Sequence, residues 1–238
     1  GVLCGIDIAR AVFEYADPAI ELEALLRDGD SFGAGDVIAR VRGRAIPVLT
    51  GERLALNFLQ RLSGIATRTR AETEKIKGTK ARIVDTRKTT PGLRVYEKYA
   101  VRVGGGGNHR FNLADGVLIK DNHIRAAGGI AKAVAAARLR APHTLKIEVE
   151  TENLAQVAEA LEAGADIVML DNMTTQAMAE AVSLIAGRAL VEASGNMDSR
   201  DLYEVAATGV DYISMGALTH SVRALDISLR FDEGSQGA

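Results

Sequence analysis

The chain has 238 residues, a formal net charge of −2, 47% hydrophobic residues and 25% charged residues. This near-neutral balance argues against a protein that coats nucleic acid or lies on a membrane surface, since both normally carry a basic field, and no apolar run is long enough to span a bilayer. At this length a folded chain buries roughly 70–75% of its unfolded surface, which predicts one large domain, or one large and one small domain.

The N-terminal sequence bears on location. Cys4 is the single cysteine, so it cannot form an internal disulfide, which fits a reducing compartment. The first residues do not resemble a signal peptide. These observations predict a cytoplasmic protein. Because the chain begins with Gly1 rather than Met, we also expect an N-terminal segment to be missing.

The first 50 residues read as short strands and turns, with β-branched residues in 1–9 and 36–49 and glycines between them. The periodicity then changes through "GERLALNFLQRLSGIATRTRAETEKI", residues 51–76. In this stretch apolar residues recur at helical spacing, at Leu54, Phe58, Leu62 and Ile65. The spacing predicts a long amphipathic helix, with Arg53 near its start.

From residue 81 onward, six short apolar runs alternate with alanine-rich helical segments. The runs are "ARIVD", "GVLIKDN", "LKIEVE", "ADIVMLDN", "RALVEASGN" and "VDYISMG". Strand followed by helix, repeated, predicts parallel strands with crossover helices and a sheet buried on both faces. The last four runs are closely spaced and no "GxGxxG" fingerprint follows any of them, which favours an α/β barrel over an open doubly wound sheet. The chain after residue 220 is expected to return to the first domain.

Polar residues end each apolar run on its C-terminal side. They include Asp85 to Lys88, Lys120 to Asn122, Glu148 and Glu150, Asp171-Asn172, Glu192 and Ser194 to Asn196. In an α/β barrel those strand ends share one rim, and that rim carries the active site. Helix caps and turns prefer Asp, Asn and Ser as well, but they do not explain Arg87, Lys88 and Lys120, because cations are disfavoured at helix N-termini.

The segment from Arg82 to Arg125 is locally basic, with nine Lys or Arg against four acids. This excess predicts an anionic ligand, since Arg and Lys both suit carboxylate or phosphate. A solvated charged face is the alternative for the cations in 94–102. His109 and Arg110 follow four glycines, whose bare backbone allows a ligand to approach closely, so we expect this pair to contact the ligand.

Two late glycine turns resemble phosphate-binding loops. One contains Ser194, Gly195 and Asn196, the other contains Gly216, and each leads from a strand into a predicted helix. Exposed N–H groups at helix starts favour anions, and α/β barrels often hold phosphate between the last two strand–helix loops.

Two carboxylates complete the predicted site. Glu150 and Asp171 end successive strands, so they are expected to be neighbours on the rim. Carboxylates beside a polyanion are accommodated most simply by Mg²⁺ bridged to phosphate oxygens. The alternative is that each carboxylate pairs with a nearby cation, and spacing alone leaves both open.

Blocks of the sequence, in order, resemble the quinolinate phosphoribosyltransferase family. They are "ERLALNFLQRLSGIAT", "DTRKTTPGLRVYEKYAVRVGGGGNHRFNLADGVLIKDNHI", "LKIEVE", "AGADIVMLDN", "VEASGN" and "DYISMGALTHS". The resemblance runs from about Gly1 to Phe231, and "TRKTTPG" and "KDNH" are its most specific parts. Family members normally carry a further helical N-terminal segment, which this sequence lacks.

The resemblance implies a small open-faced α/β sandwich domain, residues 1–53, joined by the C-terminal tail from about 221 to 238. Residues 54–220 would form a seven-stranded α/β barrel. It implies a homodimer or larger homo-oligomer. The implied reaction joins quinolinate to phosphoribosyl pyrophosphate and gives nicotinate mononucleotide, pyrophosphate and carbon dioxide, in de novo NAD synthesis.

The resemblance also implies roles for individual residues. The dicarboxylate pocket would contain Arg87, His109, Arg110 and Lys120. Lys88 would lie near the pyrophosphate, and Arg53 would reach a partner subunit's site. The remaining positions are Glu150 and Asp171 near the ribose hydroxyls and Mg²⁺, and Ser194, Gly195, Asn196 and Gly216 around the 5-phosphate. Many members have a second glycine where Asn196 stands.

Three alternatives remain open at this point. A sibling phosphoribosyltransferase would use another acceptor, such as nicotinate, or resemble homologues found near molybdate-transport genes. A non-catalytic barrel that senses phosphorylated metabolites would not need Glu150 and Asp171. A generic phosphate-binding isomerase barrel would not need the basic segment between Arg87 and Lys120.

Overall fold

The computed structural model describes residues 1–232, and the chain divides into two compact units. The first unit contains Gly1–Arg70, Val95–Gly105 and the chain from Val222 onward; the second contains Ala71–Arg94 and Gly106–Ser221. The expected domain boundary after residue 53 falls inside helix α2 (Ala45–Lys75), which continues into the second unit. Of the expected tail, residues 233–238 lie outside the described part of the chain.

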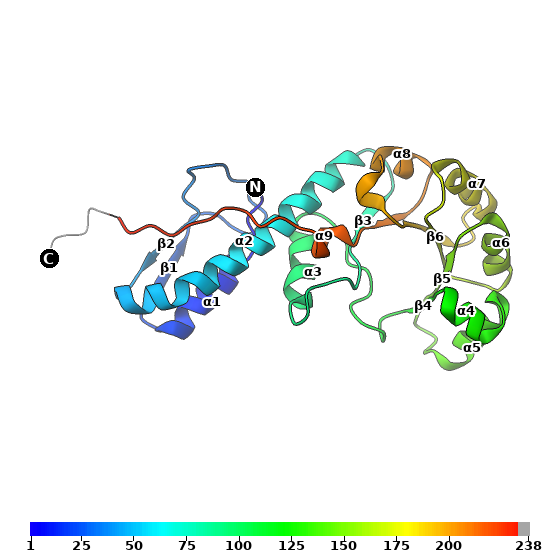
Figure 1. Cartoon of the computed structure of the whole chain (residues 1–238), viewed down its shortest axis with the longest axis horizontal. Coiled ribbons are helices and arrows are strands. Elements are labelled where there is room, and N and C mark those ends of the chain that lie inside the picture. The colour runs from blue at the N-terminus through cyan, green and yellow to red at the C-terminus, as the bar shows by residue number, and fades with distance from the viewer. Residues whose placement is uncertain (233–238) are drawn as a thin grey trace. The chain divides into compact units, whose positions relative to one another are not determined.

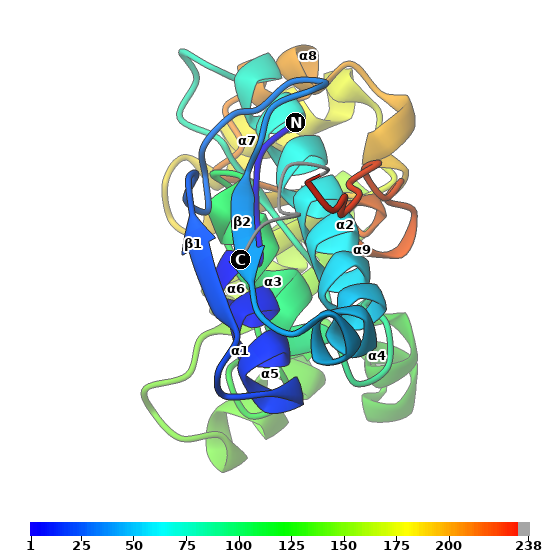
Figure 2. The ribbon, with the colours of Figure 1, turned by 90° about the vertical axis from the view of Figure 1, so that its left-hand side faces the viewer.

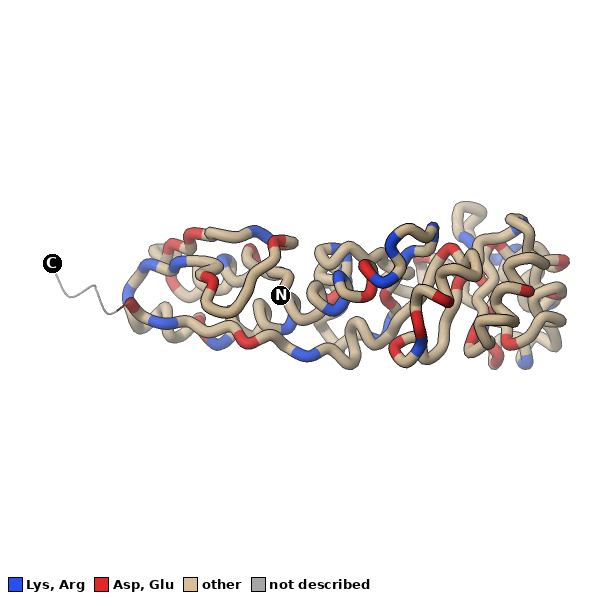
Figure 3. The backbone as a smooth tube through the Cα atoms, turned by 90° about the horizontal axis from the view of Figure 1, so that it is seen from above, with Lys and Arg blue, Asp and Glu red and all other residues tan. Residues whose placement is uncertain are grey.

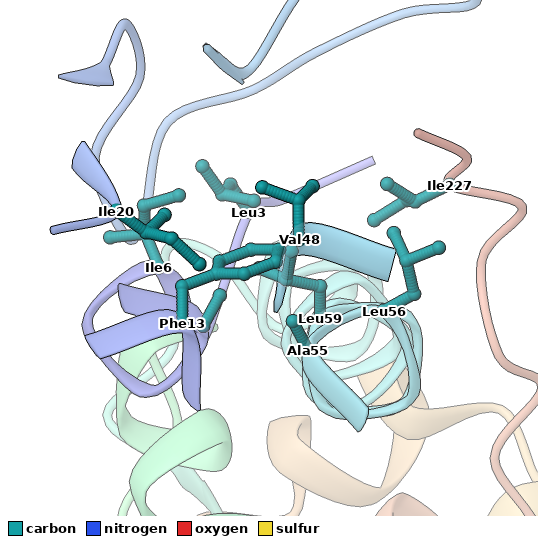
Figure 4. Close-up of a cluster of buried hydrophobic side chains, with 10 residues drawn as sticks. Leu3, Ile6, Phe13, Ile20, Val48, Ala55, Leu56, Leu59 and Ile227 are labelled. Atoms are coloured by element: carbon teal, nitrogen blue, oxygen red, sulfur yellow. The ribbon is translucent and has the colours of Figure 1, made fainter. Parts of the chain in front are cut away.

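The first unit pairs a two-stranded sheet with helices. Strands β1 (Glu21–Ala24) and β2 (Ala39–Arg42) are antiparallel (Figure 2). Helix α1 (Ile6–Ala16) and most of α3 (Arg94–Val103) also belong to this unit. Figure 4 shows the core of the unit, in which side chains from α1 and α2 meet Ile227 of the C-terminal segment.

The C-terminal segment is held in the first unit by a hydrogen bond and by a close backbone approach. Nε2 of Gln60 donates to the carbonyl oxygen of Ile227 at 2.7 Å. A β-carbon at Gly64 would overlap the carbonyl oxygen of Arg223, so only glycine allows the segment to cross α2 at this point.

Two predictions for the first 50 residues are wrong. Residues 6–9 begin α1 rather than a strand, and 45–50 begin α2, six residues before the predicted helix. The β-branched residues of 1–9 are misleading, because Ile6, Ala9 and Phe13 form one buried helical stripe. Pro47 is tolerated in the first turn of α2, where a backbone N–H has no intrahelical partner.

The second unit contains one parallel sheet built from all six predicted runs. The strands are β3 (Arg82–Val84), β4 (Val117–Ile119), β5 (Ile147–Thr151), β6 (Ile167–Asp171), β7 (Leu190–Ser194) and β8 (Tyr212–Ser214). Their order is β3-β8-β7-β6-β5-β4, and every pairing is parallel. The predicted alternation of buried parallel strands and helices is confirmed.

Helices follow the strands and cover the outer side of the sheet. They are α4 (Asp121–Ala127), α5 (Ile130–Arg140), α6 (Leu154–Glu162), α7 (Thr175–Ile185), α8 (Leu202–Ala207) and α9 (Ala217–His220), with a 3₁₀ turn η1 (Met197–Ser199) after β7. Figure 1 shows α5 to α8 outside the strands that they connect. Side-chain caps start several of them; Asn153 accepts from the N–H of Gln156, and Thr174 from that of Ala177.

A short segment stands in the place of the seventh strand that the family resemblance implies. Gly107 forms a single parallel bridge with Val84. Its N–H donates to the carbonyl oxygen of Ile83 at 2.8 Å, and its own carbonyl oxygen accepts from Asp85 at 3.2 Å. The parallel sheet of the second unit therefore contains six regular strands within the described residues, with one bridged segment beside β3. Glycines disfavour a longer strand here, because they have no side chains to pack on the sheet.

Acidic and basic residues are mixed along the backbone of both units. Figure 3 shows Lys and Arg interspersed with Asp and Glu along the tube. Among the helices of residues 1–232, none combines the length and the apolar character that crossing a membrane requires, although α2 has 31 residues.

Candidate active site

The register of the parallel sheet places several predicted residues on one face. Glu150 lies opposite Met169, Met169 opposite Glu192, and Asp171 opposite Ser194. Because alternate residues of a strand share a face, Glu150, Asp171 and Ser194 project from the same face at the C-terminal ends of β5, β6 and β7. The structure thus brings these three predicted site residues to one rim.

Lys120 and Glu150 form an ion pair on this rim. Nζ of Lys120 donates a hydrogen bond to Oε2 of Glu150, and the glutamate side chain is 14% exposed. Lys120 immediately follows β4, and β4 is the neighbour of β5, so the pair joins adjacent strand ends. Asp171 accepts a hydrogen bond from Nδ2 of Asn172 at 2.8 Å. Pairing with a nearby cation, the alternative considered for both carboxylates, therefore holds for Glu150.

Arg87 and Lys88 stand on a loop whose backbone is fixed. Oγ1 of Thr219 donates to the carbonyl oxygen of Lys88 at 2.7 Å, and Nη2 of Arg94 donates to that of Arg87 at 3.2 Å. Arg94 also donates to Oγ1 of Thr89 at 3.0 Å, so it supports the loop. The side chains of Arg87 and Lys88 are exposed and have no carboxylate partner among the described residues. They are available to an anion.

The glycine turns after β7 and β8 are tightly packed. A β-carbon at Gly195, whose φ is +91°, would overlap the Asn172 side chain. Asn196 donates from Nδ2 to Oδ1 of Asn172 at 3.1 Å, and both asparagines have positive φ, +51° and +54°. At Gly216 a β-carbon would lie 3.0 Å from the side chains of Lys88 and His220. Left-handed backbone concentrated at strand ends is typical of functional sites.

His109 lies in a buried cluster rather than on the open rim. Its Nε2 is 3.3 Å from Oε2 of Glu148 and 3.6 Å from Oε2 of Glu192. Its Nδ1 accepts from the backbone N–H of Arg110 at 2.7 Å. Asp85, fully buried, accepts from the backbone N–H of His109 at 2.8 Å and from Nδ2 of Asn108 at 2.7 Å.

Burial and neighbouring charges shift three pKa values in this cluster. Burial, and to a smaller extent the Glu148 carboxylate, raise the pKa of Glu192 to about 8. Burial by itself would lower the pKa of His109, but the hydrogen bond with Glu148 and the charge of Glu192 outweigh it, so that this pKa is raised. Burial lowers the pKa of Arg110, and the charge of Arg87 lowers it further.

The charge of Arg87 acts on the pKa of Arg110, so the two guanidinium groups lie within electrostatic range of one another. Nη1 of Arg110 donates to the carbonyl oxygen of Gly116 at 2.8 Å, which fixes its direction. Two cations close together, one of them with no carboxylate partner in the described residues, are arranged to receive a multiply charged anion such as a dicarboxylate or a phosphate.

The sequence matches two family models that together span the fold. Residues 1–63 match the N-terminal domain of quinolinate phosphoribosyl transferase, and residues 65–230 match its C-terminal domain. This chain belongs to the quinolinate phosphoribosyltransferase family.

Relatives in this family are similar over nearly the whole chain. A probable nicotinate-nucleotide pyrophosphorylase (carboxylating) from Synechocystis is 48% identical, with 97% of this chain and 79% of the relative covered. The corresponding Bacillus subtilis protein is 47% identical, with 96% and 79% covered. The crystal structure of NadC from Streptococcus pyogenes is 48% identical, has a TM-score of 0.91, and covers 95% of this chain and 80% of that one.

Within the quinolinate phosphoribosyltransferase fold, the predicted residues fall into three groups. The rim of the second unit holds Lys88, Arg87, Lys120, Glu150, Asp171, Ser194, Gly195, Asn196 and Gly216. His109 and Arg110 lie on the bridged segment beside β3. Arg53 is exposed on α2 in the first unit.

Sequence reasoning assigned no role to Glu148 and Glu192, although it placed both among polar strand ends. Both are 4% exposed and lie inside apolar strands, "LKIEVE" and "RALVEASGN". The signal was present, because a carboxylate inside a strand buried on both faces is costly unless it is paired or protonated. The group that faces both carboxylates is His109, which is distant from them in the sequence, so the local sequence does not identify it.

Proposed function

We propose that this chain transfers the phosphoribosyl group of phosphoribosyl pyrophosphate to quinolinate, releasing pyrophosphate and carbon dioxide and forming nicotinate mononucleotide, the reaction of de novo NAD synthesis. The observation that carries the proposal is the pair of neighbouring guanidinium groups, Arg87 and Arg110, on the strand-end side of a family fold. The two carboxylates of quinolinate match two guanidinium groups.

The residues take roles that follow from their charge and position. Arg87, Arg110 and Lys120 bind the dicarboxylate, and Lys88 stabilises the charge that develops on the leaving pyrophosphate. Glu150 and Asp171 lie where carboxylates stabilise the positive ribose centre. The pyridine nitrogen then attacks, becomes cationic, and accepts the electron pair released when the adjacent carboxylate leaves as carbon dioxide.

The backbone turns suit the 5-phosphate. At Gly195 a β-carbon would overlap the Asn172 side chain, and at Gly216 it would crowd Lys88 and His220, so both turns present bare backbone; Ser194 and Asn196 offer polar side chains beside them. Main-chain N–H groups at such turns are suitable donors to phosphate oxygens. We assign this phosphate to the turns after β7 and β8.

Mg²⁺ fits the donor set of the rim. Glu150 and Asp171 provide carboxylate oxygens at adjacent strand ends, the ligand type that Mg²⁺ prefers, together with substrate phosphates and water. When bound, the ion would neutralise pyrophosphate charge. Because Glu150 is paired with Lys120, this lysine would have to exchange that partner for substrate.

We further propose a homodimer or larger homo-oligomer in which Arg53 reaches a neighbouring site. Support comes from α2, where large apolar side chains flank this arginine in exposed positions: Ile46 is 80% exposed and Leu49 and Leu54 are 53% exposed each. Exposed apolar residues at helical spacing are typical of a subunit interface. We propose a cytoplasmic location, in keeping with the single, buried thiol.

The decisive experiment follows product formation by chromatography. Purified protein is incubated with quinolinate, phosphoribosyl pyrophosphate and Mg²⁺, with nicotinate as a parallel acceptor and with a chelator as a further control. We expect nicotinate mononucleotide from quinolinate alone, and none with chelator. Turnover of nicotinate but not quinolinate would assign a different acceptor, and tight binding without any product would favour a sensing role.

A further inference from the structure

His109, Glu148 and Glu192 form a cluster inside the barrel of the second unit. Their side chains are 15%, 5% and 5% exposed. Oε1 of Glu148 and Oε1 of Glu192 are buried and form no well-aligned hydrogen bond in the described part of the chain. Buried carboxylates that are only partly satisfied are costly, so the cluster calls for a functional explanation.

The orientation of the imidazole decides what the cluster does. Nδ1 of His109 accepts the N–H of Arg110, so the proton of the neutral ring is on Nε2, which points at the two glutamates. The three side chains have the composition of a cation site. Coordination through Nε2 would move the proton to Nδ1, however, where it would meet the Arg110 N–H. The two glutamates are therefore better suited to accept a hydrogen bond from the Nε2–H of His109 than to bind a metal ion together with this ring.

The imidazole is one of several anchors that hold the segment around Arg110. Asn108 and His109 follow consecutive glycines, which place no side chains on the sheet. Asp85, after β3, binds Asn108 and the His109 backbone, while Glu148 on β5 and Glu192 on β7 face the His109 ring. The ring in turn accepts from the Arg110 backbone. Three strands thus fix the residue that carries the guanidinium.

We propose that Glu148 and Glu192 are positioning residues which, through His109, hold Arg110 where it receives a carboxylate of the acceptor. The proposal rests on the proposed function. It gives His109 a role that differs from the direct substrate contact expected from the sequence, because both ring nitrogens are engaged inside the protein. A 1 Å error in such a positioned group is enough to weaken catalysis markedly.

The test is a double-mutant cycle with Glu148→Met and Arg110→Ala. Glu148→Met keeps the volume but removes the acceptor. We expect it to raise KM for quinolinate about 10- to 100-fold and leave KM for phosphoribosyl pyrophosphate within about twofold. In the Arg110→Ala background it should change KM for quinolinate less than twofold. Equal rises in both KM values, or the same rise in both backgrounds, would overturn the proposal.

Two controls separate positioning from general damage. Met169→Leu changes a buried residue on the same face, in register with Glu192, and should leave both KM values unchanged. If Glu148→Met does not fold, His109→Leu replaces it in the cycle. An effect of His109→Leu that persists without Arg110 would mean that the imidazole contacts quinolinate itself.

A second readout does not depend on turnover. Two-bond ¹H–¹⁵N correlation spectra of the four histidines should show one ring protonated at Nε2 only, assigned by its loss in His109→Leu, and its signals should shift in Glu148→Met. A proton on Nδ1 would refute the positioning scheme even if the enzyme is active. Absence of turnover with the expected tautomer present would instead count against the proposed function.

Discussion

In the first unit, Glu97 is fully buried and accepts hydrogen bonds from Nε and Nη2 of Arg61 at 2.8 and 2.5 Å. In the second unit, Glu148 and Glu192 share one histidine at 3.3 and 3.6 Å and each keeps a buried oxygen without a hydrogen bond among the described residues. Strong charge-assisted hydrogen bonds are about 2.7–2.9 Å long. The first arrangement therefore satisfies its carboxylate, and the second leaves two buried acidic side chains incompletely hydrogen-bonded.

This difference separates a structural ion pair from a functional cluster. The guanidinium of Arg61 forms an ion pair with Glu97. The guanidinium of Arg87, in contrast, is exposed and lies within electrostatic range of Arg110. Burial with incomplete pairing shifts pKa values, and such shifts concentrate at active sites. The two units thus use the same residue types for different purposes, and substitutions should affect stability in one unit and acceptor binding in the other.

The largest effect is expected for Arg87→Ala. Arg87 is exposed in this structure, but bound quinolinate would cover it. Removing one partner of a charge pair that is buried in a complex typically costs about 3–5 kcal/mol, roughly a hundred- to several-thousand-fold in affinity. We expect quinolinate binding, measured by titration calorimetry, to be lost. Arg138→Ala, which removes an exposed partner of Asp166, is the matched control and should bind normally. Near-normal KM and kcat in Arg87→Ala would remove Arg87 from the site.

Arg61→Ala should act on stability instead. It leaves Glu97 buried without its guanidinium, which is expected to lower the free energy of unfolding by about 3 kcal/mol. Urea denaturation followed by circular dichroism measures the change. Replacing both residues, Arg61→Met with Glu97→Leu, should recover most of the loss, because an apolar pair leaves no unpaired charge in the interior. A loss below about 1 kcal/mol would mean that the pair behaves like a surface salt bridge.

Glu192→Gln tests the second cluster through pH. The folded protein holds the Glu192 proton up to about pH 8, whereas the unfolded chain releases it near 4.5. This stabilisation is fully present below the unfolded value and is lost as pH rises to about 8, at about 1.4 kcal/mol per pH unit. The raised pKa of His109 acts in the same direction. Glu192→Gln should flatten this dependence, as measured by denaturation between pH 5.5 and 8. An unchanged slope would contradict the assignment.

Much of the fold follows from local pattern. The six apolar runs became the six strands because a strand buried on both faces is built mainly from apolar residues. The rim residues Lys120, Glu150, Asp171 and Ser194 were predictable for the same reason, since the C-terminal ends of parallel strands meet at one edge.

The orientation of the His109 side chain could not be predicted from its neighbours in the sequence. It depends on Glu148 and Glu192, which are 39 and 83 positions further along the chain, and on a hydrogen bond to the Arg110 backbone. The seventh strand position was hidden as well, because "GGGGNHR" has no strand periodicity and pairs through one bridge only. The early start of α2 was missed because Pro47 reads as a breaker unless its place in the first turn is known.

The smallest effect concerns Cys4 and tests how rarely the first unit, which contains the Arg61–Glu97 ion pair, opens to solvent. Burial raises the pKa of this thiol, and the charge of Asp28 raises it further, so the reactive thiolate is scarce. Its backbone N–H also donates to Oγ of Ser63 at 3.0 Å. A disulfide reagent should therefore label the native protein on the order of 10³-fold more slowly than the denatured chain, which corresponds to an opening free energy of about 4 kcal/mol. Cys4→Ser provides the blank. Arg61→Ala should accelerate labelling, because it weakens the same unit, whereas Glu192→Gln should leave the rate unchanged. Acceleration by both variants would show that the two units open together and that the contrast between them does not extend to their stability.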